Sequence, residues 1–298
     1  MKMLMFGSLQ NDRKDKNMKK VLLIISLLLL LPLNINCKAL LVKNYKGDIV
    51  MGNPNICDTD YSKGVLIYTP KNNNYLYIAK GEMYRDVSFS ENKDQILGIT
   101  GECSIVEYNI NEKKTITITE GIKGEPYSNV KYVPKSNNIS FASVDLYLYI
   151  YNRTTKENRL VTQLDGDYAW SKNGKKLYYS DNMVIYRMDI ESKKTVSIDK
   201  GFDPQLSADN NYIVFKTARD ELTVREIKTD KEWKYKTTVG IDYYKFSPDA
   251  QQIAIIQANT SWKYIYGQQL LVWNFKNNEK VTLIEHISQG FGCNFDWK

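Results

Sequence analysis

Hydrophobic and polar positions follow a short period through most of this 298-residue chain. Runs such as residues 176–180, 212–216 and 252–256 are alternating or continuously apolar, which is typical of half-buried or buried strands. Paired runs joined by charged turns, as in residues 186–199 and 224–238, indicate hairpins. No stretch with a helical period interrupts them. The pattern therefore predicts an all-β protein.

A short phrase recurs before these strands: a small polar residue, two variable residues, a large apolar anchor and usually a Ser. The phrases begin and reach their anchors at Asp58 and Tyr61, Asp86 and Phe89, Asn129 and Tyr132, Asp167 and Trp170, Asp203 and Leu206, Tyr243 and Phe246, and Asn294 and Trp297. The anchors recur at intervals of about 40 residues, close to the roughly 40 to 50 of propeller blades. Each repeat predicts one four-stranded antiparallel blade that begins with the phrase.

A lone four-stranded meander leaves both sheet edges open, whereas radial stacking buries the faces of all the sheets. We therefore expect a single β-propeller over residues 40–298, with seven blades preferred and six as the alternative. The phrase at Asn294 has no strands after it, and residues 39–42 and 48–52 are β-like runs that precede the first phrase. We expect these N- and C-terminal strands to share the seventh blade and close the ring.

Two copies of the phrase, Trp170-Ser-Lys-Asn-Gly174 and Phe246-Ser-Pro-Asp249, resemble the aromatic-Ser-Pro-Asp-Gly repeat of TolB-type, WD40-like bacterial propellers. The resemblance covers most of residues 56–298, although Ser-Pro-Asp is kept only after Phe246 and Asn-Gly only after Trp170. It implies that the phrase forms the innermost strand of each blade. Members of that family act as periplasmic scaffolds or as gating domains appended to hydrolases, so the resemblance implies a fold more than a task.

Residues 1–39 are typical of an export signal. A Met-Lys-Lys start at Met18, a candidate true start of the chain, precedes an aliphatic run over residues 21–31. That run is shorter than the about 20 residues that cross a bilayer. Cleavage after Ala39 would give soluble export, whereas residues 33–37 resemble a bacterial lipoprotein box that would place a lipid on Cys37. These two fates and an uncleaved anchor stay open, and all three predict an exported body.

Charge and motifs argue against several functional classes. The formal charge of +7 comes mostly from residues 1–39, so the rest of the chain is close to neutral and we expect no nucleic-acid partner. The chain has no Gly-x-Ser-x-Gly nucleophile turn, and its only histidine is His286, which argues against multi-histidine metal sites. We therefore expect no enzyme activity.

Innermost strands would bring the first residues of the phrases to one mouth of the channel. The candidate ligand-binding residues are Asp58, Asp86, Asn129, Asp167, Asp203, Asp242 and Asn294. Their oxygens suit a hard cation such as Ca²⁺, and several carboxylates would attract a basic peptide. Asp and Asn also precede strands simply because their side chains bond nearby backbone N–H groups. Both interpretations stay open, and no other cofactor is expected.

The cysteines suggest one crosslink, because export lets disulfides persist. Cys57 and Cys293 each lie four residues before an anchor, in the two blades that would meet at the ring closure. A Cys57–Cys293 disulfide that leaves Cys103 free is one hypothesis, and ordinary buried thiols are the alternative.

The sequence thus predicts a non-catalytic, exported propeller that acts as a monomeric protein-interaction scaffold in the cell envelope. It would lie in the periplasm, or be anchored by lipid facing the periplasm or the cell surface. It would touch a membrane only through its signal or that lipid. The alternative is a carbohydrate- or cation-binding propeller, with scope for enzyme activity, that uses the acidic channel mouth.

Overall fold

The computed structural model describes residues 45–52, 55–56, 64–79, 84–120, 127–259, 267–288 and 294–298. The chain divides into two units, Met1–Lys38 and Ala39–Lys298, and all described residues belong to the second. The predictions for residues 1–39, including Met18 and Cys37, lie outside the described residues. Within the described ranges, no helix is both long enough and apolar enough to cross a membrane.

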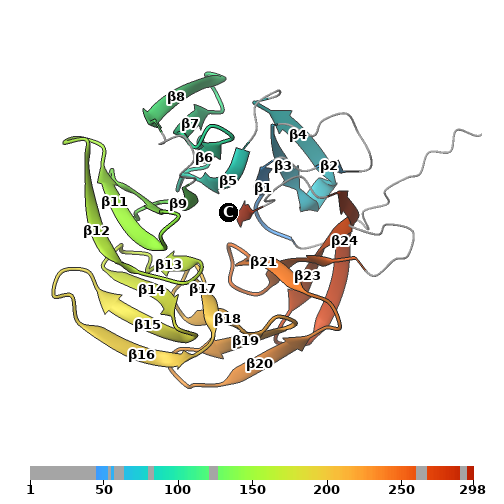
Figure 1. Cartoon of the computed structure of the whole chain (residues 1–298). Helices are drawn as coiled ribbons and strands as arrows, with labels where there is room; N and C mark the ends of the chain where they lie inside the picture. Colours follow the sequence, from blue (N-terminus) through green and yellow to red (C-terminus); the bar gives the residue numbers. More distant parts are fainter. Residues whose placement is uncertain are drawn as a thin grey trace, which may run out of the picture. The chain divides into compact units, whose positions relative to one another are not determined.

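The second unit is a β-propeller whose antiparallel sheets lie side by side around a centre (Figure 1). Each sheet is named here after its lowest-numbered strand of the main meander. The β1 blade contains β25 (Phe295–Trp297), β1 (Ile49–Gly52), β3 (Val65–Thr69) and β4 (Asn74–Ile78), with a short 3-10 turn η1 (Pro70–Asn72) before β4. The β5 blade contains β5 (Tyr84–Phe89), β6 (Gln95–Thr100), β7 (Ile105–Asn109) and β8 (Lys114–Thr119). The β9 blade contains β9 (Ser128–Tyr132), β10 (Ile139–Ala142), β11 (Tyr147–Asn152) and β12 (Glu157–Gln163).

The other three blades repeat the same meander. The β13 blade contains β13 (Tyr168–Trp170), β14 (Lys176–Asp181), β15 (Val184–Asp189) and β16 (Thr195–Lys200). The β17 blade contains β17 (Phe202–Leu206), β18 (Tyr212–Ala218), β19 (Glu221–Glu226) and β20 (Glu232–Lys236). The β21 blade contains β21 (Ile241–Phe246), β22 (Ile253–Ala258), β23 (Gly267–Asn274), β24 (Glu279–Ser288) and a fifth strand, β2 (Asn55–Ile56). The predicted four-stranded antiparallel unit is confirmed.

The propeller has six blades, so the preferred count of seven is wrong and the alternative of six is right. The prediction placed the phrases at Asp58 and Asn294 in two different blades. In the structure β1 pairs with β25 on one side, where Ile49 faces Trp297, and with β3 on the other, where Gly52 faces Val65. The strands β1, before the Asp58 phrase, and β3, after it, therefore already belong to one complete four-stranded sheet. Asp58 itself lies outside the described residues.

The Ser of the phrase shapes the turn between the first and second strands. The hydroxyl oxygens of Ser171, Ser207 and Ser247 each accept a hydrogen bond from the backbone N–H five residues later, at 2.9 to 3.0 Å. Three residues after Ser, the backbone is left-handed, with φ of 69° at Gly174 and 59° at Asn210. Gly and Asn adopt that conformation at low cost, which explains the Asn-Gly preference in this repeat. The Ser and the left-handed residue of the phrase therefore stabilise the turn between the first two strands of the blade.

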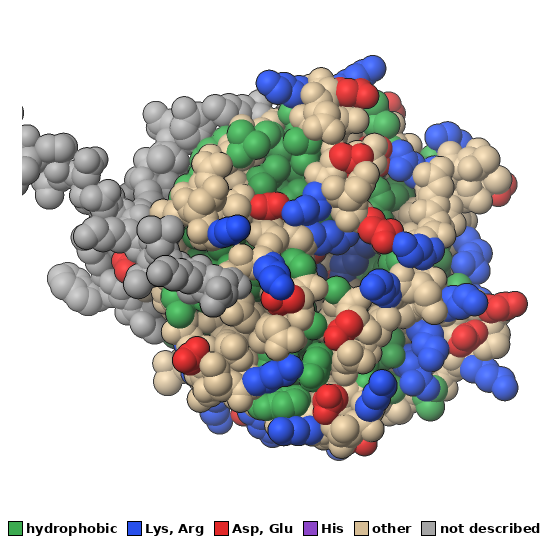
Figure 2. All heavy atoms as spheres, turned by 180° about the vertical axis from the view of Figure 1, so that it is seen from behind, with side chains coloured by type: hydrophobic (Ala, Val, Ile, Leu, Met, Phe, Trp, Pro, Cys, Tyr) green, Lys and Arg blue, Asp and Glu red, His purple; other side chains and the backbone are tan. Residues whose placement is uncertain are grey.

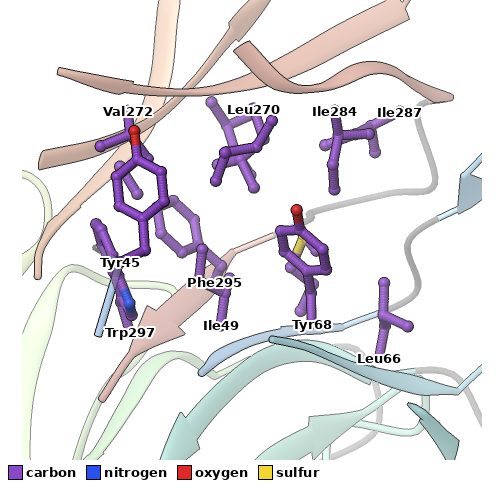
Figure 3. Packing of buried hydrophobic residues seen from close by; sticks show 14 residues of the cluster. Tyr45, Ile49, Leu66, Tyr68, Leu270, Val272, Ile284, Ile287, Phe295 and Trp297 are labelled. Atoms are coloured by element: carbon purple, nitrogen blue, oxygen red, sulfur yellow. The ribbon is translucent and has the colours of Figure 1, made fainter. Parts of the chain in front are cut away.

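Apolar side chains pack between neighbouring blades. Figure 3 shows this for the β1 and β21 blades, where Phe295, Ile49 and Tyr68 face Leu270 and neighbouring residues of β23 and β24. Sheets stacked in this way bury apolar residues of both partners. Segments from both ends of the propeller unit therefore share one apolar cluster.

We predict that Phe295→Ala strongly destabilises the propeller. Phe295 has no exposed surface, so truncation leaves a cavity between two blades and should cost about 3–5 kcal/mol of unfolding free energy. Leu160→Ala is the control, because Leu160 on the outer strand β12 is 51% exposed and its truncation should cost less than about 0.5 kcal/mol. Urea denaturation of both variants measures the difference, and equal costs would contradict the packing described above.

Candidate functional site

Two rings of side chains line the centre of the propeller. Residues alternate between two directions along a strand, so the positions three before and one before each anchor share a direction. The first ring, three residues before the anchor, contains Asp86, Asn129, Asp167, Asp203, Tyr243 and Asn294. The second ring, one residue before the anchor, contains Ser88, Lys131, Ala169, Gln205, Lys245 and Asp296.

The two rings line two cavities that share three residues. The first ring lines a cavity of about 860 Å³, termed the first mouth, at the N-terminal ends of the innermost strands. The second ring lines a cavity of about 460 Å³, termed the second mouth, toward their C-terminal ends. Gln205, Lys245 and Asn294 line both cavities, so these three residues lie between the two mouths.

The structure brings six of the seven predicted ligand-binding residues together at the first mouth. They are Asp86, Asn129, Asp167, Asp203, Asp242 and Asn294. In the β21 blade Tyr243 holds the ring position, and Asp242 precedes it. The seventh residue, Asp58, lies outside the described residues, as do Cys57 and Cys293 of the disulfide hypothesis. Cys103 is a buried free thiol.

The carboxylates of the first ring join neighbouring blades. Asp86 Oδ2 accepts a hydrogen bond from the backbone N–H of Asn129 at 2.7 Å, and its Oδ1 accepts one from Asn294 Nδ2 at 2.6 Å. Asp203 Oδ1 accepts a hydrogen bond from the N–H of Asp167 at 2.8 Å. These bonds connect the β5 blade to both of its neighbours and the β13 blade to the β17 blade. These carboxylate oxygens therefore stabilise the contacts between blades.

Two lysines of the second ring share the carboxylate of Asp167. Lys131 Nζ lies 2.5 Å from Asp167 Oδ1, and Lys245 Nζ lies 3.3 Å from Oδ2. Gln205 donates to Oδ2 at 2.6 Å and accepts from Lys245 Nζ at 2.8 Å. Lys131 Nζ also donates to the carbonyl oxygen of Tyr168. The centre of the channel therefore contains a charge network.

A third lysine reaches the first mouth from a second strand. Lys216 on β18 lies 3.1 Å from Asp203 Oδ2 and donates to the carbonyl oxygen of Asp242 at 3.2 Å. None of the three lysines was among the residues predicted from the sequence. Lys131 and Lys245 lie two residues after first-ring positions, and the strand period would have placed them in the channel. Lys216 ends an apolar run, and its ion-pair partner Asp203 lies on the neighbouring strand β17 of the same blade, a pairing that the repeated phrase does not encode.

Burial and charge shift the pKa values of this network. Burial raises the pKa of Asp86, although the hydrogen bonds from Asn294 and Asn129 oppose the shift. Burial also opposes ionisation of Asp167, but Lys131 and Lys245 outweigh it and hold its pKa well below the ordinary value. Burial lowers the pKa of Lys131 to about 8, with Lys245 adding to the effect and Asp167 opposing it.

The arrangement of acidic side chains bears on the prediction of a cation site. Within the described ranges, no group of three or more His, Cys, Asp or Glu side chains is placed to hold a metal ion. Asp242, which is exposed at the first mouth, accepts from Gln268 Nε2 at 2.6 Å. The prediction of a Ca²⁺ site stays a prediction.

Two exposed apolar side chains line the first mouth. Val144 and Leu146, in the turn between β10 and β11, are 42% and 46% exposed. Both line this cavity together with Tyr127 and Tyr243. Exposed apolar side chains beside a hollow are typical of a contact surface.

No protein-family model matches this chain, and no curated protein matches it. The function is therefore argued from the geometry of the two mouths.

We predict that Asp167→Asn destabilises the propeller in a pH-dependent way. The variant leaves Lys131 and Lys245 buried without their shared counter-charge, which should cost about 3 kcal/mol near pH 7. The pKa of Asp167 is lowered by folding, so its contribution is present above about pH 4 and is lost as the pH falls further. Urea denaturation at pH 7 and pH 3 should therefore show a smaller difference from the wild type at pH 3.

Asp199→Asn is the matched control. Asp199 pairs with Arg225, which also lies 2.6 Å from Glu232 and so keeps a carboxylate partner in the variant; the loss should cost less than about 1 kcal/mol. A cost equal to that of Asp167→Asn, or a pH-independent difference at Asp167, would contradict the proposed role of the buried network.

Proposed function

We propose that this chain is a non-catalytic β-propeller that binds a partner protein at the first mouth. The exposed pair Val144 and Leu146, at the rim of the 860 Å³ cavity, is the observation that carries the proposal. Adjacent exposed apolar side chains beside a hollow are typical of protein-interaction surfaces. The tyrosines that line the same cavity add surfaces that tolerate both apolar and polar contacts.

The polar floor of the first mouth favours this function over the alternative. A cation or carbohydrate site needs oxygens that are available for a ligand. Asp86, Asp167 and Asp203 already hold backbone N–H groups, amides and lysines. A ligand that took these oxygens would have to break bonds between blades. A partner that contacts the rim leaves them in place.

A propeller suits such a task because its rigid blades present turns around one opening. The pairing of β25 with β1 supports the further proposal that strands from both ends of the unit close the ring. We place this scaffold in the cell envelope, as a monomer with a protein partner and no nucleic acid. The TolB-like phrases after Trp170 and Phe246 support this assignment by resemblance alone.

The rim contact is tested by site-specific photo-crosslinking in the cell of origin. A photoreactive residue at position 146 should give one defined crosslinked species, because Leu146 projects at the rim of the mouth. The same residue at position 116 is the control, since Ile116 on the outer strand β8 is 43% exposed but does not line the first mouth. No product at position 146, or the same product at position 116, would refute the proposed contact.

Export predicts a shortened chain in the envelope fraction. Residues 1–39 have the basic start and short aliphatic run of a secretory signal. Intact-mass spectrometry should therefore find a chain that begins after Ala39, or one that begins at Cys37 with added acyl mass. A full-length chain recovered from the cytoplasm would overturn this assignment.

A further inference from the structure

The second mouth has a different chemistry from the first. Its lining includes five lysines, at positions 93, 131, 172, 245 and 298, and only two acidic residues, Glu91 and Asp296. Figure 2 shows Lys and Arg side chains within the central hollow of one face of the molecule. The walls also include Pro134, Leu206 and Pro248. The second mouth is thus a basic cavity with some apolar wall.

Both acidic residues of this lining have other partners. Glu91 pairs with Lys135 at 2.7 Å, out on the exposed surface. Asp296 Oδ2 accepts a hydrogen bond from the N–H of Phe89 at 3.0 Å, and its Oδ1 accepts one from the N–H of Trp297 at 3.0 Å. Neither carboxylate makes a direct ion pair with a lysine of the lining, as far as the described residues show.

The lysines are only partly neutralised. Lys131 and Lys245 share one carboxylate, that of Asp167. Lys298 Nζ donates to a neutral group, the carbonyl oxygen of Phe89, at 2.7 Å. Lys172 is exposed at the rim. Only Lys93, which lies 2.8 Å from Asp48, has a carboxylate partner of its own. Five lysines thus face the two carboxylates of the lining together with those of Asp48 and Asp167, which leaves an excess of one positive charge.

These lysines lie at two depths. Lys131 and Lys245 belong to the second ring, inside the channel. Lys172 follows an anchor by two residues, in the turn at the rim. The strand β13 ends at Trp170, so Lys172 lies beyond the end of the strand, whereas the second ring lies within the strands. A single inorganic ion cannot touch both levels, whereas an extended chain with carboxylates along it can.

We propose that the second mouth binds an acidic, extended segment of a partner polypeptide, whose carboxylates contact Lys172 and Lys298 at the rim and enter toward Lys131 and Lys245. The apolar wall formed by Pro134, Leu206 and Pro248 contacts the body of the segment. This site is separate from the rim contact at Leu146, so a partner at one mouth does not require a partner at the other.

The proposal is tested with a fluorescent hexa-glutamate peptide and the whole propeller in an anisotropy titration. The peptide should bind with an affinity that falls as salt is added, and the matched hexa-glutamine peptide should not bind. Lys172→Glu combined with Lys298→Gln should raise the Kd about tenfold, because both positions lie at the rim and neither has a carboxylate partner to lose. Lys114→Gln, an exposed residue on the outer strand β8, should leave the Kd unchanged.

Each other outcome overturns the assignment. Equal binding of the glutamine peptide, no binding of the glutamate peptide, or an unchanged Kd in the rim variant would each remove the acidic-segment site. Inorganic phosphate is also added in place of chloride at constant ionic strength. Complete displacement of the glutamate peptide by phosphate would show that the second mouth binds small anions and not an acidic segment. Circular dichroism confirms that the variants are folded. Leu146→Asp should leave peptide binding unchanged, so failure at the first mouth is distinguishable from failure here.

Discussion

The innermost strand of each blade packs against neighbouring sheets with one set of side chains and lines the channel with the other. The rest of the structure depends on that constraint. One set of its side chains packs into the apolar layers between sheets, as Phe295 and Tyr168 do. The alternate set lines the channel as two rings. Because the strand period is two, a single short phrase of sequence serves both the stacking of the blades and the chemistry of the channel.

The polar side chains in the channel therefore stabilise the fold, in addition to any role in binding. Buried carboxylates and lysines are tolerated only with partners, because an unpaired buried charge is costly. Asp86 and Asp203 find their partners in backbone N–H groups of adjacent blades, and Asp167 finds its partners in Lys131 and Lys245. Hydrogen bonds and ion pairs therefore connect the blades at the inner edge of the ring, in addition to the apolar contacts between the sheets.

These links also make the two mouths unlike each other. At the first mouth the carboxylates are occupied, and an exposed aliphatic pair stands at the rim. At the second mouth the lysines outnumber their counter-charges. The two openings of the propeller therefore differ in chemistry.

The sequence by itself determined the local features. Alternation predicted the strands, the repeated phrase predicted four-stranded blades, and the first residues of the phrases predicted which side chains gather at one mouth. Each of these depends on neighbours within a few residues along the chain. Only the tertiary structure decided the number of blades, because the pairing of β1 with both β25 and β3 joins segments from both ends of the propeller unit. It also decided the partners of the carboxylates, since Lys131, Lys216 and Lys245 meet Asp167 and Asp203 through the register of strands and the contacts between blades, which the phrase does not encode.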